Sequence, residues 1–491
     1  MRAASAARID RSAQETAAHI RRLPPAPNLD PDGSMFFQGV DGDMGKRLLL
    51  FVGFGSLGDI CPLLAVAEKM KRSHEVVFLA NEYFREYVEQ RGVAFHSIGT
   101  VENQLAAKES ESSTGENKEG RIHRFDRVIG RSFAPAFDYI KTLVQSGRQP
   151  VVVSHGNLSP AALACEAFKI PLIITYYSPS HIPHNDEDSV QFFNFYRGRE
   201  WFVRYIEVPI KKLRHRINPD IKPLYNQYRA SLGLPPMAGF FRSTWRRLTH
   251  TSQFGPSTPL HIALLPQWFC EPIDKKLAGV EFAGFAFLSP KPEPDSSELA
   301  NFLIKHPKPI VFTPGTAVED VREFCKHIIP ICRKLGSPGI FASKHGKAVF
   351  DDLPKAEDVP LLYLEHADFD TLLPRARCLI HHGGIGTVAQ AVKAGIPQIL
   401  RPRMYDQPAN GVRVMMFGLG GSLAPTHFSA DRVANILLHI ENSRLHAERI
   451  PYYSNLVRQE SGVDNCVRHI EAYLDGHAYE DEEALERLQL C

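Results

Sequence analysis

The chain has 491 residues, which is too long for one ordinary hydrophobic core and predicts two domains of about 200 residues each. Its hydrophobic fraction of 44% and charged fraction of 23% are typical of a folded globular protein, so general disorder is excluded. A net charge of only +2 excludes a generally basic nucleic-acid-binding protein.

The cysteines and the apolar pattern indicate the cellular setting. The eight cysteines are scattered and form no CxxC pair, which argues against a zinc knuckle or a disulfide framework and favours buried thiols in a reducing compartment. The sequence contains no apolar run of about 18 residues and no apolar segment of a secretion signal near its start. We therefore expect a cytoplasmic protein.

Residues 1–45 are rich in Ala, Arg, Pro and Gly, and we expect a disordered N-terminal tail there, whose place in the mature protein stays open. Ordered structure is predicted to begin at Lys46, because residues 47–52 form a continuous apolar run typical of a strand buried on both faces. A glycine-rich turn at 53–59, a helix at 62–70 and a strand at 75–80 follow. This order is the building block of a parallel doubly wound sheet.

The middle of the chain continues the same alternation. Residues 106–120 are polar and of low complexity and predict a loop. After it come a predicted strand at 150–154, a helix at 160–168 and a strand at 171–177. Residues 185–250 are expected to be mostly helical.

A proline-rich segment at 288–294 predicts a linker, after which the alternation restarts. The predicted elements are strands at 309–313, 339–343, 360–364, 378–381 and 397–401, and helices at 319–335 and 386–393. Residues 474–488 are acidic and predict a solvated segment. Two successive doubly wound domains are the simplest interpretation.

The segment IHHGGIGT, from Ile380 to Thr387, carries the strongest functional signal. A strand that opens into a glycine-rich turn at a helix N-terminus lets backbone N–H groups approach a diphosphate, and a histidine there can add a charge-assisted hydrogen bond. Asp406 and Gln407 follow the next predicted strand at the same edge of the sheet, and a carboxylate with a carboxamide suits sugar hydroxyls. The spacing favours a nucleotide or phosphate site, and a turn without a ligand is the alternative.

From His382 to Gln407 the sequence resembles the donor signature of the UDP-glycosyltransferase family, and the resemblance extends from Lys46 to the C-terminal helices. The similarity is to bacterial and fungal members, such as the rhamnosyltransferase of rhamnolipid synthesis and the macrolide or sterol glycosyltransferases. The family implies an α/β fold of GT-B architecture, in which two Rossmann-like doubly wound domains face one another across a cleft.

The resemblance implies a division of the chain into five parts. These are a disordered tail (1–45), an acceptor-binding Rossmann-like domain (46–257), an interdomain segment and linker (258–295), a nucleotide-sugar-binding Rossmann-like domain (296–447), and C-terminal helices that pack back toward the N-terminal domain, with an acidic tail (448–491).

The resemblance also implies roles around the donor diphosphate. His382 and Thr387 would contact the diphosphate, and Gly384 and Gly386 would shape the turn. Thr316 matches a second loop of the family on the phosphate side.

Three further residues would contact the rest of the donor. Gln390 would lie at the ribose, and Asp406 and Gln407 would hold the transferred sugar. Many members stack the uracil on a tryptophan, but this chain has Leu364 there, with Tyr363 beside it. Uracil and thymine therefore both remain open.

A sugar acceptor hydroxyl needs a general base to take its proton. Asp59 lies in GSLGDICP, after the first predicted strand, and matches a position that is His in plant members and Asp in several bacterial ones. We expect Asp59 to be the base, and a helix N-cap before Pro62 is the alternative. His155 matches the place of the orienting partner, and the hypothesis is that it pairs with Asp59. A loop histidine on the acceptor side is the alternative.

The resemblance implies an inverting hexosyltransferase that uses a UDP- or dTDP-sugar and acts on a hydroxyl of a small, lipophilic acceptor such as a lipid, sterol or secondary metabolite. We expect no cofactor beyond the nucleotide-sugar co-substrate, no metal and no nucleic-acid partner. The alternatives are a non-catalytic sugar-nucleotide-binding helper protein and an epimerase-type enzyme on the same fold.

An excess of aromatic residues between 176 and 250, beginning with Tyr176 and Tyr177, suits an apolar acceptor pocket, with ordinary core packing as the alternative. The basic stretch 211–216 favours a solvated face. The alternative for this stretch is peripheral contact with the inner face of a membrane.

Overall fold

The computed structural model describes residues 46–106, 125–127, 129–156, 159–179, 182, 222–236, 260–270, 279–289, 297–315, 321–344, 346–354, 356–403 and 406–475. The expected N-terminal tail, the polar loop after residue 106, the basic stretch 211–216 and the acidic segment after 475 lie outside these ranges. Most of the region 185–250, expected to be helical, also lies outside them.

The described part of the N-terminal domain contains a seven-stranded parallel sheet in the order β3-β2-β1-β4-β5-β6-β7. Strand β1 is an inner strand and pairs in parallel with β2 and β4. Every residue of β1 is buried, as its continuous apolar run predicts. The strands are β1 (Leu48–Val52), β2 (Glu75–Asn81), β3 (Ala94–Gly99), β4 (Pro150–His155), β5 (Leu172–Tyr176), β6 (Leu260–Ala263) and β7 (Glu281–Phe282).

Strands β6 and β7 correct the expected domain boundary. Both fall within 258–295, the range expected to be an interdomain segment and linker, yet they extend the N-terminal sheet beyond residue 257. They are short, and the sequence signal of such strands is weak compared with the proline-rich run that follows them.

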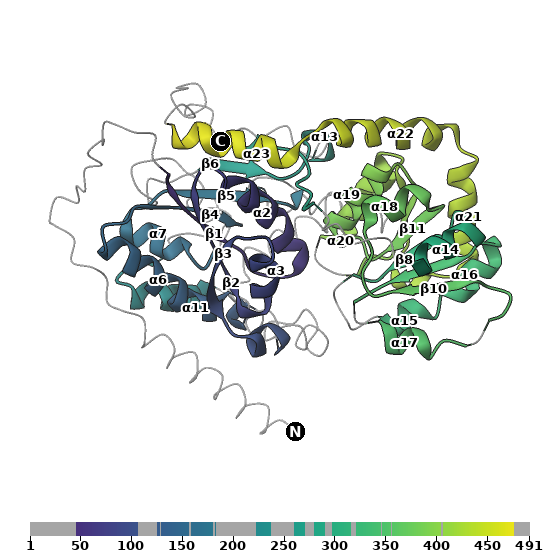
Figure 1. The fold of residues 1–491 in the computed structure, drawn as a ribbon, viewed down its shortest axis with the longest axis horizontal. Helices are drawn as coiled ribbons and strands as arrows, with labels where there is room; N and C mark the ends of the chain where they lie inside the picture. The colour runs from purple at the N-terminus through teal and green to yellow at the C-terminus, as the bar shows by residue number, and fades with distance from the viewer. Residues whose placement is uncertain are drawn as a thin grey trace, which may run out of the picture.

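Helices cover both faces of this sheet (Figure 1). They are α2 (Leu57–Met70), η1 (Glu82–Phe84), α3 (Arg85–Glu89), η2 (Gly130–Ser132), α6 (Phe133–Gln145), α7 (Ala162–Phe168), α11 (Lys222–Ser231) and α13 (Gln267–Cys270). Helix α2 begins at Leu57 rather than at the predicted Pro62, because Ser56 and Asp59 form a capping box that satisfies its first N–H groups. Helix α11 is fixed to α7 by a buried, bidentate ion pair between Arg229 and Glu166, with N–O distances of 2.6 and 2.7 Å.

The described C-terminal domain contains a six-stranded parallel sheet in the order β10-β9-β8-β11-β12-β13. Its strands are β8 (Ile310–Thr313), β9 (Gly339–Ala342), β10 (Leu361–Leu364), β11 (Cys378–His381), β12 (Gln398–Leu400) and β13 (Gly420–Ser422). Both sheets therefore reverse their strand order beside the central strand, and ligands bind at such a switch point in doubly wound folds.

The helices of this domain flank its sheet. They are α14 (Ser297–Lys305), α15 (Val321–Cys325), α16 (Ile328–Leu335), α17 (Lys347–Asp351), α18 (Phe369–Leu372), η7 (Leu373–Arg375), α19 (Ile385–Ala394), α20 (Gln407–Met416), η8 (Pro425–His427) and α21 (Ala430–Glu441). The single helix expected over 319–335 is two helices, α15 and α16.

Two C-terminal helices, α22 (Arg444–Gln459) and α23 (Gly462–Leu474), run along one side of both domains (Figure 1). Helix α22 packs against α19 in the C-terminal domain, and α23 packs against α2 in the N-terminal domain. The Lys69–Asp464 ion pair and a hydrogen bond between the His74 Nε2 and the Glu471 Oε2, each 2.8 Å long, tie α23 to this domain.

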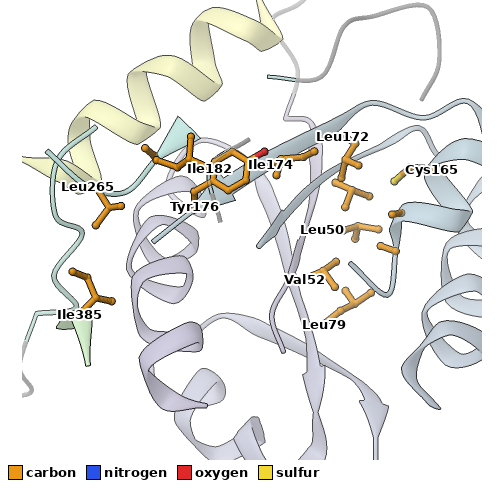
Figure 2. Close-up of a cluster of buried hydrophobic side chains, with 14 of the residues drawn as sticks. Leu50, Val52, Leu79, Cys165, Leu172, Ile174, Tyr176, Ile182, Leu265 and Ile385 are labelled. Carbon is orange, nitrogen blue, oxygen red and sulfur yellow. The ribbon is translucent and has the colours of Figure 1, made fainter. Parts of the chain in front are cut away.

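The two domains share one hydrophobic cluster. Figure 2 shows side chains of the N-terminal sheet, such as Leu50 and Ile174, and the cluster continues past Tyr176 and Leu265 to Ile385 at the start of α19. Phe269 of α13 lies 6.1 Å, centroid to centroid, from Phe417, which directly follows α20, and the Arg413 Nε of α20 donates to the Phe269 carbonyl at 3.1 Å.

Candidate active site

Three side chains meet at the carboxyl edge of the N-terminal sheet. Asp59 follows β1, His155 ends β4 and Tyr177 directly follows β5. Because β1, β4 and β5 are neighbours in the sheet, their carboxyl ends bring residues that are far apart in sequence to one place.

Asp59 occupies the first turn of α2, where it is half-buried. Its Oδ2 accepts hydrogen bonds from the Ser56 backbone N–H and from the Ser56 hydroxyl, the latter at 2.8 Å. Gly55 before it has a φ of 104° and sits against the carboxylate, where a Cβ would collide. The cap is Ser56, so Asp59 is not the N-cap itself, but it does help to hold the helix end in one orientation.

His155 lies between two aromatic rings. The centroid of its imidazole is 3.6 Å from that of Tyr177, with an interplanar angle of 23°, and 5.2 Å from that of Phe54. His155 is 6% exposed and Tyr177 is 3% exposed. The stack fixes the imidazole beside the turn that carries Asp59.

Tyr177 is the third side chain of this group. Burial, and after it the negative charges of Asp59 and Asp406, raise the pKa of Tyr177 well above its ordinary value. The phenol is therefore neutral and carries a proton to donate.

His382 lies at the glycine-rich turn after β11. Its imidazole fits between Gly315 and Gly384, and a Cβ at either glycine would collide with the ring. Burial lowers the pKa of His382 to about 4, although a hydrogen bond to the Thr313 carbonyl opposes this shift. The imidazole is therefore neutral here. The expected charge-assisted hydrogen bond requires a protonated imidazole, so the negative charge of a bound diphosphate would have to raise the pKa of His382.

The neighbouring His381 has a different role. Its Nδ1 accepts from the Gly383 N–H at 3.1 Å, and its Nε2 lies 3.0 Å from the Gln398 Oε1. Burial and the adjacent His382 lower the pKa of His381 to about 3, so this ring is a neutral support for the turn. Gly383, with a φ of 97°, makes the reversal and was not among the expected turn glycines.

The N-terminus of α19 presents backbone donors. Gly384 is the N-cap and no side chain caps the helix, so the N–H groups of its first turn point outward. A Cβ at Gly386 would meet nothing within 4 Å, so the space beside that turn is open. Thr387 lies in this turn, and Gln390 follows it with an Oε1 that is buried and has no hydrogen-bond partner in the described part of the chain.

Asp406 and Gln407 begin α20. The Asn410 Nδ2 donates both to the Asp406 Oδ2 at 2.9 Å and to the Gly383 carbonyl at 3.0 Å, which connects α20 to the glycine-rich turn. The Gln407 Oε1 accepts from the Arg403 N–H at 2.9 Å and supports the loop before α20. Asn410 was not expected at the site, although it follows Asp406 by one helical turn, which is a detectable signal.

The two remaining expected positions are Thr316 and Leu364. Thr316 lies outside the described residues, next to Gly315. Leu364, at the family's base-stacking position, is buried in the core of the C-terminal domain with Leu299 and Leu303, so its side chain packs inward.

The described residues contain no cluster of three or more His, Cys, Asp or Glu side chains that could hold a metal ion. None of the described helices is long and apolar enough to cross a membrane.

Family models match both halves of the chain. Residues 49–175 match the glycosyltransferase family 28 N-terminal domain, and residues 358–461 match the C-terminal domain of the erythromycin biosynthesis protein CIII-like family.

Curated relatives include glycosyltransferases of bacteria and plants. The O-mycaminosyltylonolide 6-deoxyallosyltransferase of Streptomyces fradiae is 27% identical, with 86% of this chain and 96% of that protein covered. Glycosyltransferase GtfC of Amycolatopsis orientalis is 26% identical, with 77% and 86% covered. The sterol 3-beta-glucosyltransferase UGT80B1 of Arabidopsis thaliana is 24% identical, with 76% of this chain and only 59% of that protein covered.

Solved structures share the fold. The calicheamicin glycosyltransferase CalG4 matches with a TM-score of 0.62 at 17% identity, covering 88% of this chain and 99% of that one. Glycosyltransferase VinC in complex with dTDP matches with a TM-score of 0.57 at 15% identity, covering 91% and 100%. These matches confirm the predicted α/β architecture of two doubly wound domains.

Proposed function

This chain is a glycosyltransferase of the GT-B type, because it matches a glycosyltransferase family 28 N-terminal domain and an erythromycin CIII-like C-terminal domain. We propose that it transfers a hexose from a UDP- or dTDP-sugar to a hydroxyl of a small, lipophilic acceptor. The observation that carries the proposal is the uncapped N-terminus of α19 at the glycine-rich turn, to which Asn410 joins Asp406.

Asp59 is the general base of the proposed reaction. It takes the proton of the acceptor hydroxyl as the acceptor oxygen attacks the anomeric carbon. The bond from that carbon to the nucleoside diphosphate breaks on the opposite side, so the configuration inverts. The bonds from Ser56 hold the Asp59 carboxylate in a fixed orientation, and the stacked His155 is its proposed partner.

The glycine-rich turn binds the leaving diphosphate. The first-turn N–H groups of α19 and the side chains of His382 and Thr387 stabilise its negative charge, which the helix dipole also favours. The open space at Gly386 admits the phosphates, and the unpaired Gln390 Oε1 accepts from a ribose hydroxyl. In this scheme the helix N-terminus performs the charge stabilisation without a metal ion.

Asp406 and Gln407 contact the transferred sugar. The names of the relatives support the substrate classes: one structural match is a complex with dTDP, and curated relatives are named for sterols and for O-mycaminosyltylonolide. A lipid, sterol or secondary metabolite is therefore the proposed acceptor class.

A donor panel tests the proposal. Wild type, His382→Ala and Asp59→Asn would be incubated with UDP-glucose, dTDP-rhamnose, UDP-glucuronate and UDP-N-acetylglucosamine, and thermal stabilisation and sugar transfer recorded. One donor should stabilise wild type and Asp59→Asn but not His382→Ala, since ligand binding stabilises the native state. Transfer by Asp59→Asn should fall about 100- to 10,000-fold, the typical contribution of a general base.

Asn keeps an oxygen that can accept from Ser56, so Asp59→Asn preserves the capping box. Donor stabilisation without transfer to any acceptor in wild type would instead indicate a non-catalytic sugar-nucleotide-binding protein. Stabilisation of His382→Ala equal to that of wild type would contradict the proposed donor site.

A further inference from the structure

Asn410 is a polar residue of α20 whose side chain is completely buried. Its Nδ2 donates to the Gly383 carbonyl at 3.0 Å and to the Asp406 Oδ2 at 2.9 Å. Both partners are acceptors, so the nitrogen of the amide, and not its oxygen, faces them. One side chain therefore uses both of its N–H groups to join two segments, the glycine-rich turn after β11 and the start of α20.

Gly383 is the part of the turn that Asn410 holds. Its N–H donates to the His381 Nδ1 at 3.1 Å, and its carbonyl accepts from Asn410. The peptide bond between Gly383 and Gly384 is planar, with its C=O and its N–H on opposite sides. The hydrogen bond from Asn410 therefore also fixes the direction of the Gly384 N–H, the N-cap amide of α19, which points away from Asn410.

Asp406 is held by the same amide on the other side. It directly precedes α20, and the Asn410 backbone N–H donates to its carbonyl at 2.9 Å. The helical turn thus exists without the side-chain bond, and what that bond adds is a fixed direction of the Asp406 carboxylate. A hydrogen bond to an ionised acceptor is roughly twice as strong as one between neutral groups. The direction of the carboxylate is thereby tied to the position of Gly383.

We propose that Asn410 is a positioning residue of the donor site, which sets the place of the Asp406 carboxylate relative to the glycine-rich turn. This inference rests on the proposed function, in which Asp406 contacts the transferred sugar and the turn binds the diphosphate. The sugar and the diphosphate are covalently joined in the donor, so both contacts form together only if the two segments keep a fixed spacing. Asn410 provides this spacing with two hydrogen bonds from one atom.

The alternative is that Asn410 only stabilises the folded chain. A buried hydrogen bond contributes to stability whatever the site does, so a loss of stability in a variant does not distinguish the two roles. Two ligands do distinguish them. A nucleoside diphosphate reaches the turn alone, whereas a nucleotide-sugar reaches the turn and Asp406, so a positioning role affects the second ligand more than the first.

The experiment measures by calorimetry the Kd of UDP, of dTDP and of the panel donor that stabilises wild type, in wild type and in Asn410→Ala. The Kd of the nucleotide-sugar should rise about tenfold to a hundredfold, the range for a lost hydrogen bond to a charged group. The Kd of the nucleoside diphosphate should rise less than about threefold, because His381 still holds Gly383. Asn410→Ser keeps one donor and should give an intermediate rise, and it carries the test if Asn410→Ala does not fold.

A double-mutant cycle tests whether Asn410 acts through Asp406. Asp406→Ala removes the sugar contact itself, so adding Asn410→Ala should raise the Kd of the nucleotide-sugar by less than about threefold further, since residues of one hydrogen-bond network do not act additively. Full additivity of the two rises would show that Asn410 acts elsewhere and would overturn the inference.

The chain offers a matched control in Asn465 of α23. Its Nδ2 also donates to a backbone carbonyl, that of Ala283 directly after β7, at 2.7 Å. Asn465→Ala therefore removes an amide hydrogen bond of the same kind in the N-terminal domain, away from the glycine-rich turn. It should lower thermal stability and leave the Kd of both ligands unchanged.

Each outcome separates the hypotheses. Equal rises in Kd for the two ligands in Asn410→Ala, or no rise for the nucleotide-sugar, would overturn the positioning role and leave the proposed function intact. The same rise for the nucleotide-sugar in Asn465→Ala would show general destabilisation and would also overturn the inference. No binding of any nucleotide-sugar by wild type would overturn the proposed function itself.

Discussion

At the scale of single residues, two adjacent histidines have different tasks. His381 points into the core and uses both ring nitrogens to hold the turn, while His382 lies over Gly315 and Gly384 beside the open end of α19. The sequence predicted the importance of His382 but not the supporting role of His381, because the direction of a side chain at the end of a strand depends on the turn that follows.

The depressed histidine pKa values predict a loss of stability in acid. His381 has a pKa of about 3 in the folded protein, against an ordinary value near 6.5. Between these two pH values the imidazole is protonated in the unfolded chain and neutral in the native state. The stabilisation from the neutral ring is complete above about pH 6.5 and is lost as the pH falls toward 3. Between pH 7.5 and pH 5 the free energy of unfolding should fall by roughly 2 kcal/mol because of His381, and urea unfolding at the two pH values measures this change.

The matched comparison is His381→Gln, which cannot titrate in this range. Its free energy of unfolding should be lower than that of wild type at pH 7.5, since the buried hydrogen bonds change, but should fall less on acidification. Equal losses in the two proteins would show that His381 does not contribute to the acid sensitivity.

At the scale of elements, the turn from β11 to α19 combines glycines with different duties. Gly383 makes the reversal with a positive φ, Gly384 leaves room for the His382 ring, and Gly386 leaves open space at the helix N-terminus. Only the first two are required by the fold. The third leaves the space that the proposed diphosphate site would use.

Substitutions at Gly384 and Gly386 should therefore act in opposite directions. Gly386→Ala should stabilise the unliganded protein by about 0.4–1 kcal/mol, because alanine reduces the freedom of the unfolded chain and favours the helix, but should weaken stabilisation by the nucleotide-sugar donor. Gly384→Ala should lower stability, because its Cβ would press on the imidazole of His382. Urea unfolding with and without donor measures both effects, and unchanged donor stabilisation in Gly386→Ala would argue against diphosphate binding there.

At the scale of the whole molecule, the two domains are joined by a common core. Trp268 and Phe269 of α13 pack with Phe417, and Trp268 also packs on Tyr453 of α22. Helix α23 then returns to the N-terminal domain and packs on α2. The domains are therefore coupled at their joint, on the side where these C-terminal helices run (Figure 1).

Coupling through the joint predicts a single unfolding transition. Wild type should unfold cooperatively in calorimetry, and Phe269→Ala should lower stability by roughly 3–5 kcal/mol and separate the transition into two steps. Phe78→Ala, in the core of the N-terminal domain alone, should cost a similar amount. Two steps already in wild type, or the same separation in Phe78→Ala, would contradict coupling through Phe269.

The sequence by itself determined nine of the thirteen described strands and some of the helices. Continuous apolar runs that alternate with helices, such as residues 47–52 and 378–381, are typical of buried parallel strands. The predicted strand ranges agree with β1, β2, β4, β5 and β8 to β12 within one or two residues. Local signals were insufficient for β3, β6, β7 and β13, and for the start of α2, where a capping box begins the helix before Pro62. The C-terminal donor residues also lie close together in sequence, so one motif predicted their shared turn.

Only the tertiary structure decided which distant residues meet. Asp59, His155 and Tyr177 come from three separate strand ends that are neighbours in the sheet. No spacing along the chain encodes that meeting, because it depends on the order of the strands in the sheet. The neutrality of His382 and Tyr177 likewise follows from burial, which a sequence does not state, since a pKa is set by the surroundings of the group after the chain has folded.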